Sequence, residues 1–182
     1  MSCPANCTCC KPTAPKRVVP EDKVSIARIE LLHPKLRVSA RAIYDEVRAL
    51  GIRMRITSTF RSFAEQQAIY NQGRTTKGAI VSWALPGTSW HNYGMAFDFS
   101  LLTEDGKALI WDITHDSPDE GDEADWMQVV AICKRHSWSW GGDWPEGKKD
   151  RPHLQYTFGK TIKQAQQMYK AGTKRADGYL NV

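Results

Sequence analysis

Apolar residues recur in a helical pattern in two long stretches of the chain. Over residues 34–50 they lie three or four positions apart, and Gly51 follows directly. This spacing places apolar side chains on one face of a helix, and glycine commonly follows the last helical turn. Residues 123–136 show a similar apolar pattern. A capping box at Ser62 predicts a third helix over residues 62–72, and a fourth is expected over residues 162–171, before Gly172. The sequence therefore predicts four helices, and the one over residues 34–50 is expected to pack on one face.

Apolar and polar residues alternate in three shorter stretches, as they do in strands with one buried face. These stretches are residues 52–57, 95–100 and 153–158. In the second, Asp98 lies between two phenylalanines and points away from the face that carries them. In the third, His153 lies on the face opposite its neighbour. Both polar side chains are thus expected on the open face of a sheet.

The order of these elements favours an α+β fold with a single domain. A chain of 182 residues, 41% of them hydrophobic, is long enough for one sizeable core. Alternating helices and strands also fit a parallel sheet, but the short turn over residues 138–144 favours a mixed or antiparallel central sheet with helices packed to one side. We expect the domain over residues 21–172, a disordered leader rich in Cys and Pro over 1–20, and a C-terminal tail over 173–182.

The five cysteines fall into two groups. Cys133 lies within an apolar helical pattern and is expected in the core. The others lie together in the leader: Cys3, Cys7, Cys9 and Cys10. Such a cluster is compatible with a bound metal, with disulfides or with a mobile tail, and the sequence leaves these alternatives open.

Charge and hydropathy limit the partners of the protein. No stretch approaches the roughly 18 to 20 apolar residues that span a bilayer, so we expect no membrane insertion. The start of the chain lacks the features of a secretory signal, which predicts a protein made in the cytoplasm. With 25 Lys and Arg against 20 Asp and Glu, the net charge of +5 favours association with a polyanion. The basic residues are dispersed and form no nucleic-acid motif, so we expect no nucleic-acid partner.

Two segments carry a histidine together with an acid at a spacing that suits a metal site. One contains His91 and Asp98, and the other contains Asp150 and His153. Catalytic zinc is usually held by three protein ligands, commonly histidine and carboxylate, and its fourth position is open to water. The remaining histidines lack such an acid and are expected to be surface or hydrogen-bonded residues: His33, His115 and His136.

Four stretches of the sequence resemble a known family. They are residues 58–62 with Gln66, residues 70–74, residues 87–99, and residues 140–144 followed by 150–155. In this order they are similar to the L-alanyl-D-glutamate peptidases found among phage endolysins. That family belongs with the zinc D-Ala-D-Ala carboxypeptidases and shares the metal-site architecture of the hedgehog signalling domain. The resemblance covers roughly residues 50 to 160 and implies a zinc site on the sheet face.

The resemblance implies a metal site and one proton-transfer residue. It makes His91, Asp98 and His153 the ligands of Zn2+, and it makes Asp150 the catalytic acid/base. Without the resemblance, Asp150 reads as an exposed loop acid paired with Arg151. General acid/base catalysis requires a group that can both take and return a proton, and a carboxylate suits that role.

The resemblance also implies substrate-binding residues. Arg61 is expected to bind and polarise the substrate carbonyl, and Gln66 and Ser89 are expected to support substrate binding. The structural alternative for Arg61 is a salt bridge at a helix end, because it lies where a strand meets the helix that begins at Ser62.

The implied activity is hydrolysis of the L-Ala-D-Glu bond in the peptide stems of peptidoglycan, by a monomer. Two alternatives remain: a D-Ala-D-Ala carboxypeptidase and a non-catalytic, zinc-dependent cell-wall binding module. The loop over residues 73–89 favours the endopeptidase, and the presence of both Arg61 and Asp150 argues against a pure binding module. We expect a lytic endolysin that reaches the cell wall through a membrane pore or a dedicated secretion system.

Overall fold

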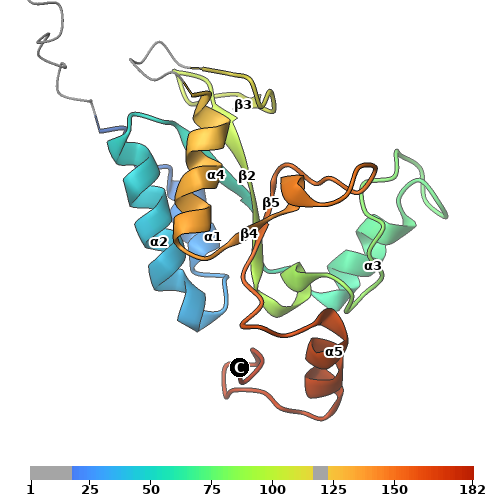
Figure 1. Cartoon of the computed structure of the whole chain (residues 1–182). Coiled ribbons are helices and arrows are strands. Elements are labelled where there is room, and N and C mark those ends of the chain that lie inside the picture. The colour runs from blue at the N-terminus through green and yellow to red at the C-terminus, as the bar shows by residue number, and fades with distance from the viewer. Residues whose placement is uncertain (1–17, 117–122) are drawn as a thin grey trace, which may run out of the picture.

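A sheet of five short strands forms the centre of the computed structural model, which describes residues 18–116 and 123–182 (Figure 1). The strands follow one another in space as β1 (Met54–Ser58), β2 (Ala96–Leu102), β5 (His153–Gln155) and β4 (Ser139–Trp140), and β3 (Leu109–Ile110) pairs with β2. Every pairing among them is antiparallel. The predicted α+β fold is confirmed, with the antiparallel form of the sheet.

The helices lie in two groups (Figure 1). The helices α1 (Lys23–Ile29), α2 (Pro34–Ala49) and α4 (Asp125–Arg135) pack against the sheet on one side. The helices α3 (Phe63–Asn71) and α5 (Ile162–Lys170) lie on the other side of it in this view. Within the described part of the chain, no helix combines the length and the apolar content that crossing a bilayer requires.

The hydrophobic core lies between the sheet and the first helix group. Phe97 and Phe99 of β2 are fully buried, and their rings lie 4.8 Å from Trp138 and 4.4 Å from Trp126. Truncating such a ring typically costs about 3–5 kcal/mol of folding stability. Cys133 is buried here and forms no disulfide, which confirms its predicted place in the core. Because the phenylalanines point into the core, Asp98 between them points to the opposite face.

Several short elements escaped the sequence analysis. The helix α1 has seven residues, and β3 and β4 have two each, which is too short for a periodic pattern. The helix α1 begins where the Asp22 carboxylate accepts a hydrogen bond from the backbone N–H of Ser25. The strand predicted over residues 153–158 ends at Gln155, and Phe158 adopts a left-handed conformation with φ 51°.

Both ends of the described chain contact the domain. Val19, within the predicted leader, is buried and donates its backbone N–H to Arg48 O. In the predicted C-terminal tail, Leu180 is buried and its carbonyl lies 2.9 Å from His33 Nε2. The Tyr179 hydroxyl donates to a backbone carbonyl of the segment after α1. The leader up to residue 17 and its cysteine cluster lie outside the described residues.

Candidate metal centre

The register of the sheet brings two of the predicted ligands together. Asp98, in β2, lies opposite Ser58 of β1 on one side and opposite His153 of β5 on the other. Directly opposed residues in antiparallel strands project to the same face of the sheet. The side chains of Asp98 and His153 therefore meet, and Asp98 Oδ1 lies 3.2 Å from His153 Nδ1 although the residues are 55 positions apart in the sequence.

The third predicted ligand comes from η2 (Trp90–Tyr93), a short 3-10 helix that precedes β2. Gly94 ends this turn with φ 67°, and a Cβ there would lie 2.9 Å from the backbone nitrogen of His33. Glycine is therefore required for the chain to enter β2 at this angle. The turn directs His91 towards the sheet, where its Nε2 lies 3.2 Å from both Asp98 Oδ1 and His153 Nδ1.

The tautomer of His91 is set by the backbone. Its Nδ1 lies 2.6 Å from the carbonyl oxygen of Thr59, and a carbonyl can only accept, so Nδ1 carries the proton and donates it. The lone pair of His91 Nε2 then points at the other two side chains. A hydrogen bond on the far ring nitrogen is the usual way in which proteins orient a metal-binding histidine.

The three side chains offer a donor set that fits a metal ion. Their potential ligand atoms, two imidazole nitrogens and one carboxylate oxygen, all lie within 4.8 Å of one another. His91 and His153 are buried, and 21% of the Asp98 side chain is exposed. Two histidines and a carboxylate with solvent on one side suit a catalytic Zn2+ site, which keeps a position open. The residues present therefore fit the predicted cofactor.

The charges of the cluster favour a cation. Burial alone would raise the pKa of the Asp98 carboxyl, but His91 and His153 outweigh it and hold that pKa well below its ordinary range. Burial would lower the pKa of His153, but Asp98 outweighs it and raises that pKa. Asp98 is thus an anion at neutral pH, and its negative charge lies where the two imidazoles converge.

Asp150 lies beside this cluster, in the loop between η3 (Gly141–Asp143) and β5. Its backbone N–H donates to Gly141 O at 3.1 Å, and its carbonyl accepts from the N–H of His153 at 3.2 Å. Partial removal of the Asp150 carboxyl from water raises its pKa, and the like charge of Asp98 adds to this, against the opposing influence of His153. The residue still reaches solvent.

The close approach of this loop depends on a missing side chain. A Cβ on Gly141 would lie 2.4 Å from the backbone oxygen of Asp150 and 3.2 Å from the Cβ atoms of both Asp150 and His153. A backbone atom at 2.4 Å cannot move away without moving the loop. Any other residue at position 141 would therefore push Asp150 away from the cluster.

Backbone hydrogen bonds hold Arg61 beside the predicted metal site. Its N–H donates to His91 O at 3.0 Å, and its carbonyl accepts from Asn92 Nδ2 at 2.9 Å. Asn92 Oδ1 in turn accepts from the N–H of Gly87 at 2.9 Å. The sequence analysis missed this buried asparagine, although it follows His91 directly. Asn92 joins three segments of the site that are distant in the sequence.

The guanidinium of Arg61 is oriented by neutral partners. It donates from Nη2 to Ser58 Oγ and from Nη1 to Gln66 Oε1, both at 3.1 Å. Gln66 is fully buried, and its Nε2 donates to Ser82 Oγ at 3.0 Å and to Ala84 O at 2.7 Å. Because its amide is used within the chain, Gln66 supports Arg61 and joins it to the long loop before η2.

The remaining predicted residue, Ser89, is the N-cap of η2. It is half-buried, and its side chain makes no capping hydrogen bond to that turn. Ser89 lies two positions before His91, on the segment that leads into β2 and Asp98. A substrate-binding role for Ser89 stays a prediction.

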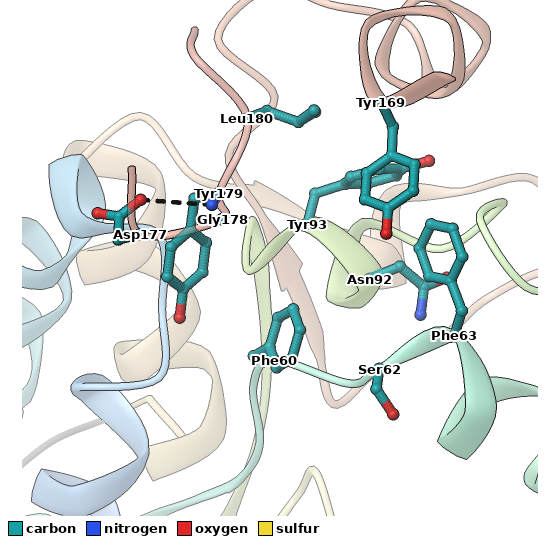
Figure 2. Close-up of a pocket in the computed structure, with 10 residues that line it drawn as sticks. All are labelled: Phe60, Ser62, Phe63, Asn92, Tyr93, Tyr169, Asp177, Gly178, Tyr179 and Leu180. Atoms are coloured by element: carbon teal, nitrogen blue, oxygen red, sulfur yellow. Dashed lines mark hydrogen bonds between the residues drawn. The ribbon is translucent and has the colours of Figure 1, made fainter. Parts of the chain in front are cut away.

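An aromatic pocket of about 290 Å3 lies next to the Arg61 segment (Figure 2). The rings of Phe60 and Tyr179 form one side of it, and those of Phe63, Tyr93 and Tyr169 form the other. None of the three metal-donor residues lines this pocket. The pocket is thus distinct from the predicted metal site, and its walls come from residues on either side of Arg61, the start of α3, η2, α5 and the C-terminal segment.

The family profile described as VanY, D-alanyl-D-alanine carboxypeptidase, matches residues 29–160, which is more than half of the chain. The chain belongs to the VanY family. The matched region includes the three metal-donor residues together with Arg61 and Asp150. The family resemblance inferred from the sequence motifs is therefore confirmed.

Within and around the VanY family, named relatives are similar to this chain over most of its length. The peptidoglycan L-alanyl-D-glutamate endopeptidase CwlK of Bacillus subtilis (strain 168) is 47% identical over 124 residues, which are 68% of this chain and 72% of the relative. The crystal structure of the Serratia marcescens L-Ala D-Glu endopeptidase ChiX has a TM-score of 0.52 at 20% identity, over 78% of this chain and 92% of that one. The likeness to ChiX is one of fold.

A D,D-dipeptidase, VanXYg, solved with a D-Ala-D-Ala phosphinate analogue, has a TM-score of 0.49 at 19% identity. That comparison covers 81% of this chain and 62% of the dipeptidase. The matched family and CwlK are both named for the hydrolysis of peptide bonds. The sequence-based expectation of a hydrolase is therefore confirmed.

Proposed function

We propose that this chain is a Zn2+-dependent endopeptidase that hydrolyses the L-Ala-D-Glu bond in the peptide stems of peptidoglycan. The observation that carries this proposal is the convergence of His91, Asp98 and His153 on one point, with Asp150 and the Arg61 segment beside it. The identity of 47% to a protein named peptidoglycan L-alanyl-D-glutamate endopeptidase supports the choice of bond.

Each residue of the site has a chemical task in this reaction. When bound, Zn2+ would supply a Lewis acid that polarises the scissile carbonyl and activates water for attack. The Asp150 carboxylate takes the proton of the attacking water and passes it to the leaving amine. Its raised pKa favours the first of these transfers, because a more basic carboxylate is a stronger proton acceptor.

Arg61 supplies positive charge for the transition state. Its guanidinium is held by Ser58 and Gln66, both neutral, so its charge is not compensated by these partners. A preorganised donor directed at a developing oxyanion contributes more than a mobile one, since it needs no reorganisation during the reaction. Gln66 therefore acts through Arg61, as a positioning residue.

A second candidate function is D-Ala-D-Ala carboxypeptidase activity, which the description of the matched family supports. The proposed zinc site and Asp150 serve both reactions, so the metal centre does not discriminate between them. The third candidate is a zinc-dependent wall-binding module without turnover, in which Asp150 would have no catalytic role.

The proposed setting follows from the substrate. We infer a monomer that binds peptidoglycan stem peptides and acts on the cell wall as a lytic enzyme, after release through a membrane pore or a dedicated secretion system. The name of CwlK, a peptidoglycan endopeptidase, supports the wall as the place of action.

Purified sacculi provide the test. The protein is incubated with them, with and without a chelator, its zinc content is measured, and the soluble products are analysed by mass spectrometry. We expect one zinc per chain and products with a new amino terminus at glutamate, absent with the chelator and absent with Asp150→Asn. Loss of a single terminal alanine instead would identify the carboxypeptidase, and binding without products would identify the wall-binding module.

A further inference from the structure

A second cavity, of about 350 Å3, adjoins Arg61 on the side of α1 and α3. Residues 57–61, the end of β1 and the segment after it, form one wall. The other walls come from α1 and the segment after it, and from α3. Phe60 lines both this groove and the aromatic pocket of Figure 2, and so lies between them. We call this cavity the arginine groove.

Two guanidinium groups line the arginine groove, those of Arg28 and Arg61. Arg28 Nη1 donates to the backbone carbonyl of Ile56 at 2.5 Å, and Arg61 donates to a serine and a glutamine. Within residues 18–116 and 123–182, neither guanidinium lies within ion-pair distance of a carboxylate. Other arginines of the first helices do form such pairs, for example Arg37 with Glu30 and Arg41 with Asp45.

One carboxylate also lines the groove, but it is already used. Glu65 Oε2 accepts from both the N–H and the hydroxyl of Ser62 at 2.7 Å, as part of the capping box that begins α3. The groove thus holds two cations against one capped anion, and its excess charge is positive. An anionic ligand complements it.

A buried hydroxyl in the same groove lacks a partner among the described residues. Thr59 is 3% exposed and lines the groove, yet its Oγ1 makes no hydrogen bond there. Buried polar groups are nearly always hydrogen-bonded, so such an atom needs an explanation. The carbonyl of the same residue accepts from His91 Nδ1, which ties the groove directly to the metal centre.

The proposed substrate has a negative charge at the required place. A glutamate whose amino group is in the scissile bond has two carboxyl groups, and the continuing chain uses only one of them. The other stays free and is ionised at neutral pH. Since one residue spans less than about 4 Å, this carboxylate lies within a residue's length of the scissile carbonyl that Arg61 would bind.

We propose that the arginine groove binds the free carboxylate of the glutamate that follows the scissile bond, with Arg28 as the specificity-determining residue and the Thr59 hydroxyl as a further donor. This inference rests on the proposed function, because it takes its ligand from that substrate. Arg28 has four N–H donors beyond the one given to Ile56, enough for a two-point contact with a carboxylate. The groove makes the enzyme selective for acidic stems over stems in which that carboxyl is amidated.

The test compares two soluble stem peptides that differ only in this group, one with a free glutamate carboxylate and one with its amide. We expect kcat/KM of the wild-type protein to be at least about 10-fold higher for the acid, as for a hydrogen bond to a charged group. Arg28→Gln should reduce this preference by raising KM for the acid more than for the amide, with zinc content unchanged. Arg37→Gln, at a half-buried arginine of α2 that pairs with Glu30, is the matched control.

Equal rates on the two peptides in the wild-type protein would overturn the proposal, and so would an equal loss on both in Arg28→Gln. Because Arg28 also bonds to Ile56, Arg28→Lys is a second variant that keeps a cation and a donor, and it should retain part of the preference.

A separate measurement needs no turnover: NMR titration of the wild-type protein with a D-Glu-L-Lys dipeptide and with its amide. Shifts at Thr59 with the acid alone are expected, and identical shifts with both would refute the groove. If neither peptide is cut but the acid still binds selectively, the proposed function fails and the groove stands.

Discussion

Two clusters of polar side chains on β1 and β2 differ in how their charges are balanced. At the α1–β1 junction, Arg55 donates from Nε and Nη2 to the two oxygens of Asp22, at 3.0 and 2.9 Å, and Ser25 Oγ donates to Asp22 at 2.7 Å. Both oxygens of Asp22 accept hydrogen bonds, and the charges of Asp22 and Arg55 cancel. At the metal centre, Asp98 Oδ1, His91 Nε2 and His153 Nδ1 all lie 3.2 Å apart.

The difference separates a structural cluster from a functional one. The three atoms of the metal centre bring more lone pairs than protons, since the proton of His91 is given to Thr59 O. A cation relieves this mutual repulsion, whereas the Asp22 cluster needs nothing from outside. Both clusters bring charged side chains within hydrogen-bond distance, so the balance of donors and acceptors is the feature that indicates function.

The largest effect is expected from His91→Ala, which removes one of the converging lone pairs. We expect loss of both the bound zinc and hydrolysis to background, because two remaining ligands hold Zn2+ weakly. Zinc per chain and product release from sacculi measure this. His136→Ala, a histidine at the end of α4, serves as the control and should behave like the wild type. Full zinc content in His91→Ala would refute the assignment.

Asp150→Asn should separate turnover from metal binding. The amide keeps the size of the side chain but accepts no proton, and general acid/base catalysis typically contributes about 10² to 10⁴ in rate. We expect a loss of that order in kcat, with near-normal zinc content and an unchanged unfolding temperature. Undiminished turnover would exclude Asp150 as the proton acceptor.

Removal of the metal should destabilise the fold by an amount set by mass action. At a free zinc concentration of about 100 times Kd, bound metal adds about 2.7 kcal/mol to the free energy of unfolding. Urea titrations with and without a chelator give this difference. On chelation, the free energy of unfolding of the Asp22→Asn variant should fall by the same amount as that of the wild type, because the Asp22 cluster binds no metal. A protein equally stable in both conditions would argue against a metal site.

The Asp22 cluster should give a smaller effect that depends on pH. Burial would raise the pKa of Asp22, but hydrogen bonds from Arg55 and Ser25 lower it overall. A carboxyl with a lowered folded-state pKa stabilises the fold above its unfolded pKa of about 3.9, and this contribution is lost as pH falls through the folded-state value. Asp22→Asn should therefore cost about 1–3 kcal/mol at pH 7 and progressively less below about pH 4. A cost independent of pH would mean that the charge of Asp22 contributes nothing.

The smallest effect is expected from deleting residues 1–17. The predicted leader has no apolar periodicity, so it should add little to the core, and the deletion keeps Val19, whose N–H bonds to Arg48 O. Hydrolysis of sacculi and the unfolding temperature should stay close to the wild-type values. Failure of the shortened protein to fold would show that the cysteine cluster is structural.

The sequence was most informative where local rules decide the structure. Long periodic segments predicted α2 and α4, and the capping box at Ser62 placed the start of α3. The convergence of His91, Asp98 and His153 was expected from motifs, and the antiparallel register of β2 with β5 provides its geometry. Their binding of zinc stays a prediction.

The rest depended on contacts between distant segments. No local pattern shows that Gln66 uses its amide on Ser82 and Ala84, or that Arg28 lines the same groove as Arg61. The packing of Leu180 against His33 is likewise a product of the folded chain. Such contacts pair residues by their place in three dimensions, so the order of residues alone does not reveal them.

Gly141 has a consequence for how variation in this protein should be interpreted. Position 141 offers no side chain for chemistry, yet a saturation mutagenesis library should find it as intolerant as the histidines, with alanine already harmful. Because the loop that carries Asp150 would be displaced, such variants should fold while losing turnover, a phenotype easily mistaken for that of a catalytic residue. A design that transfers this site to another scaffold would have to leave the position equivalent to Gly141 without a side chain, as well as copy the residues that surround it.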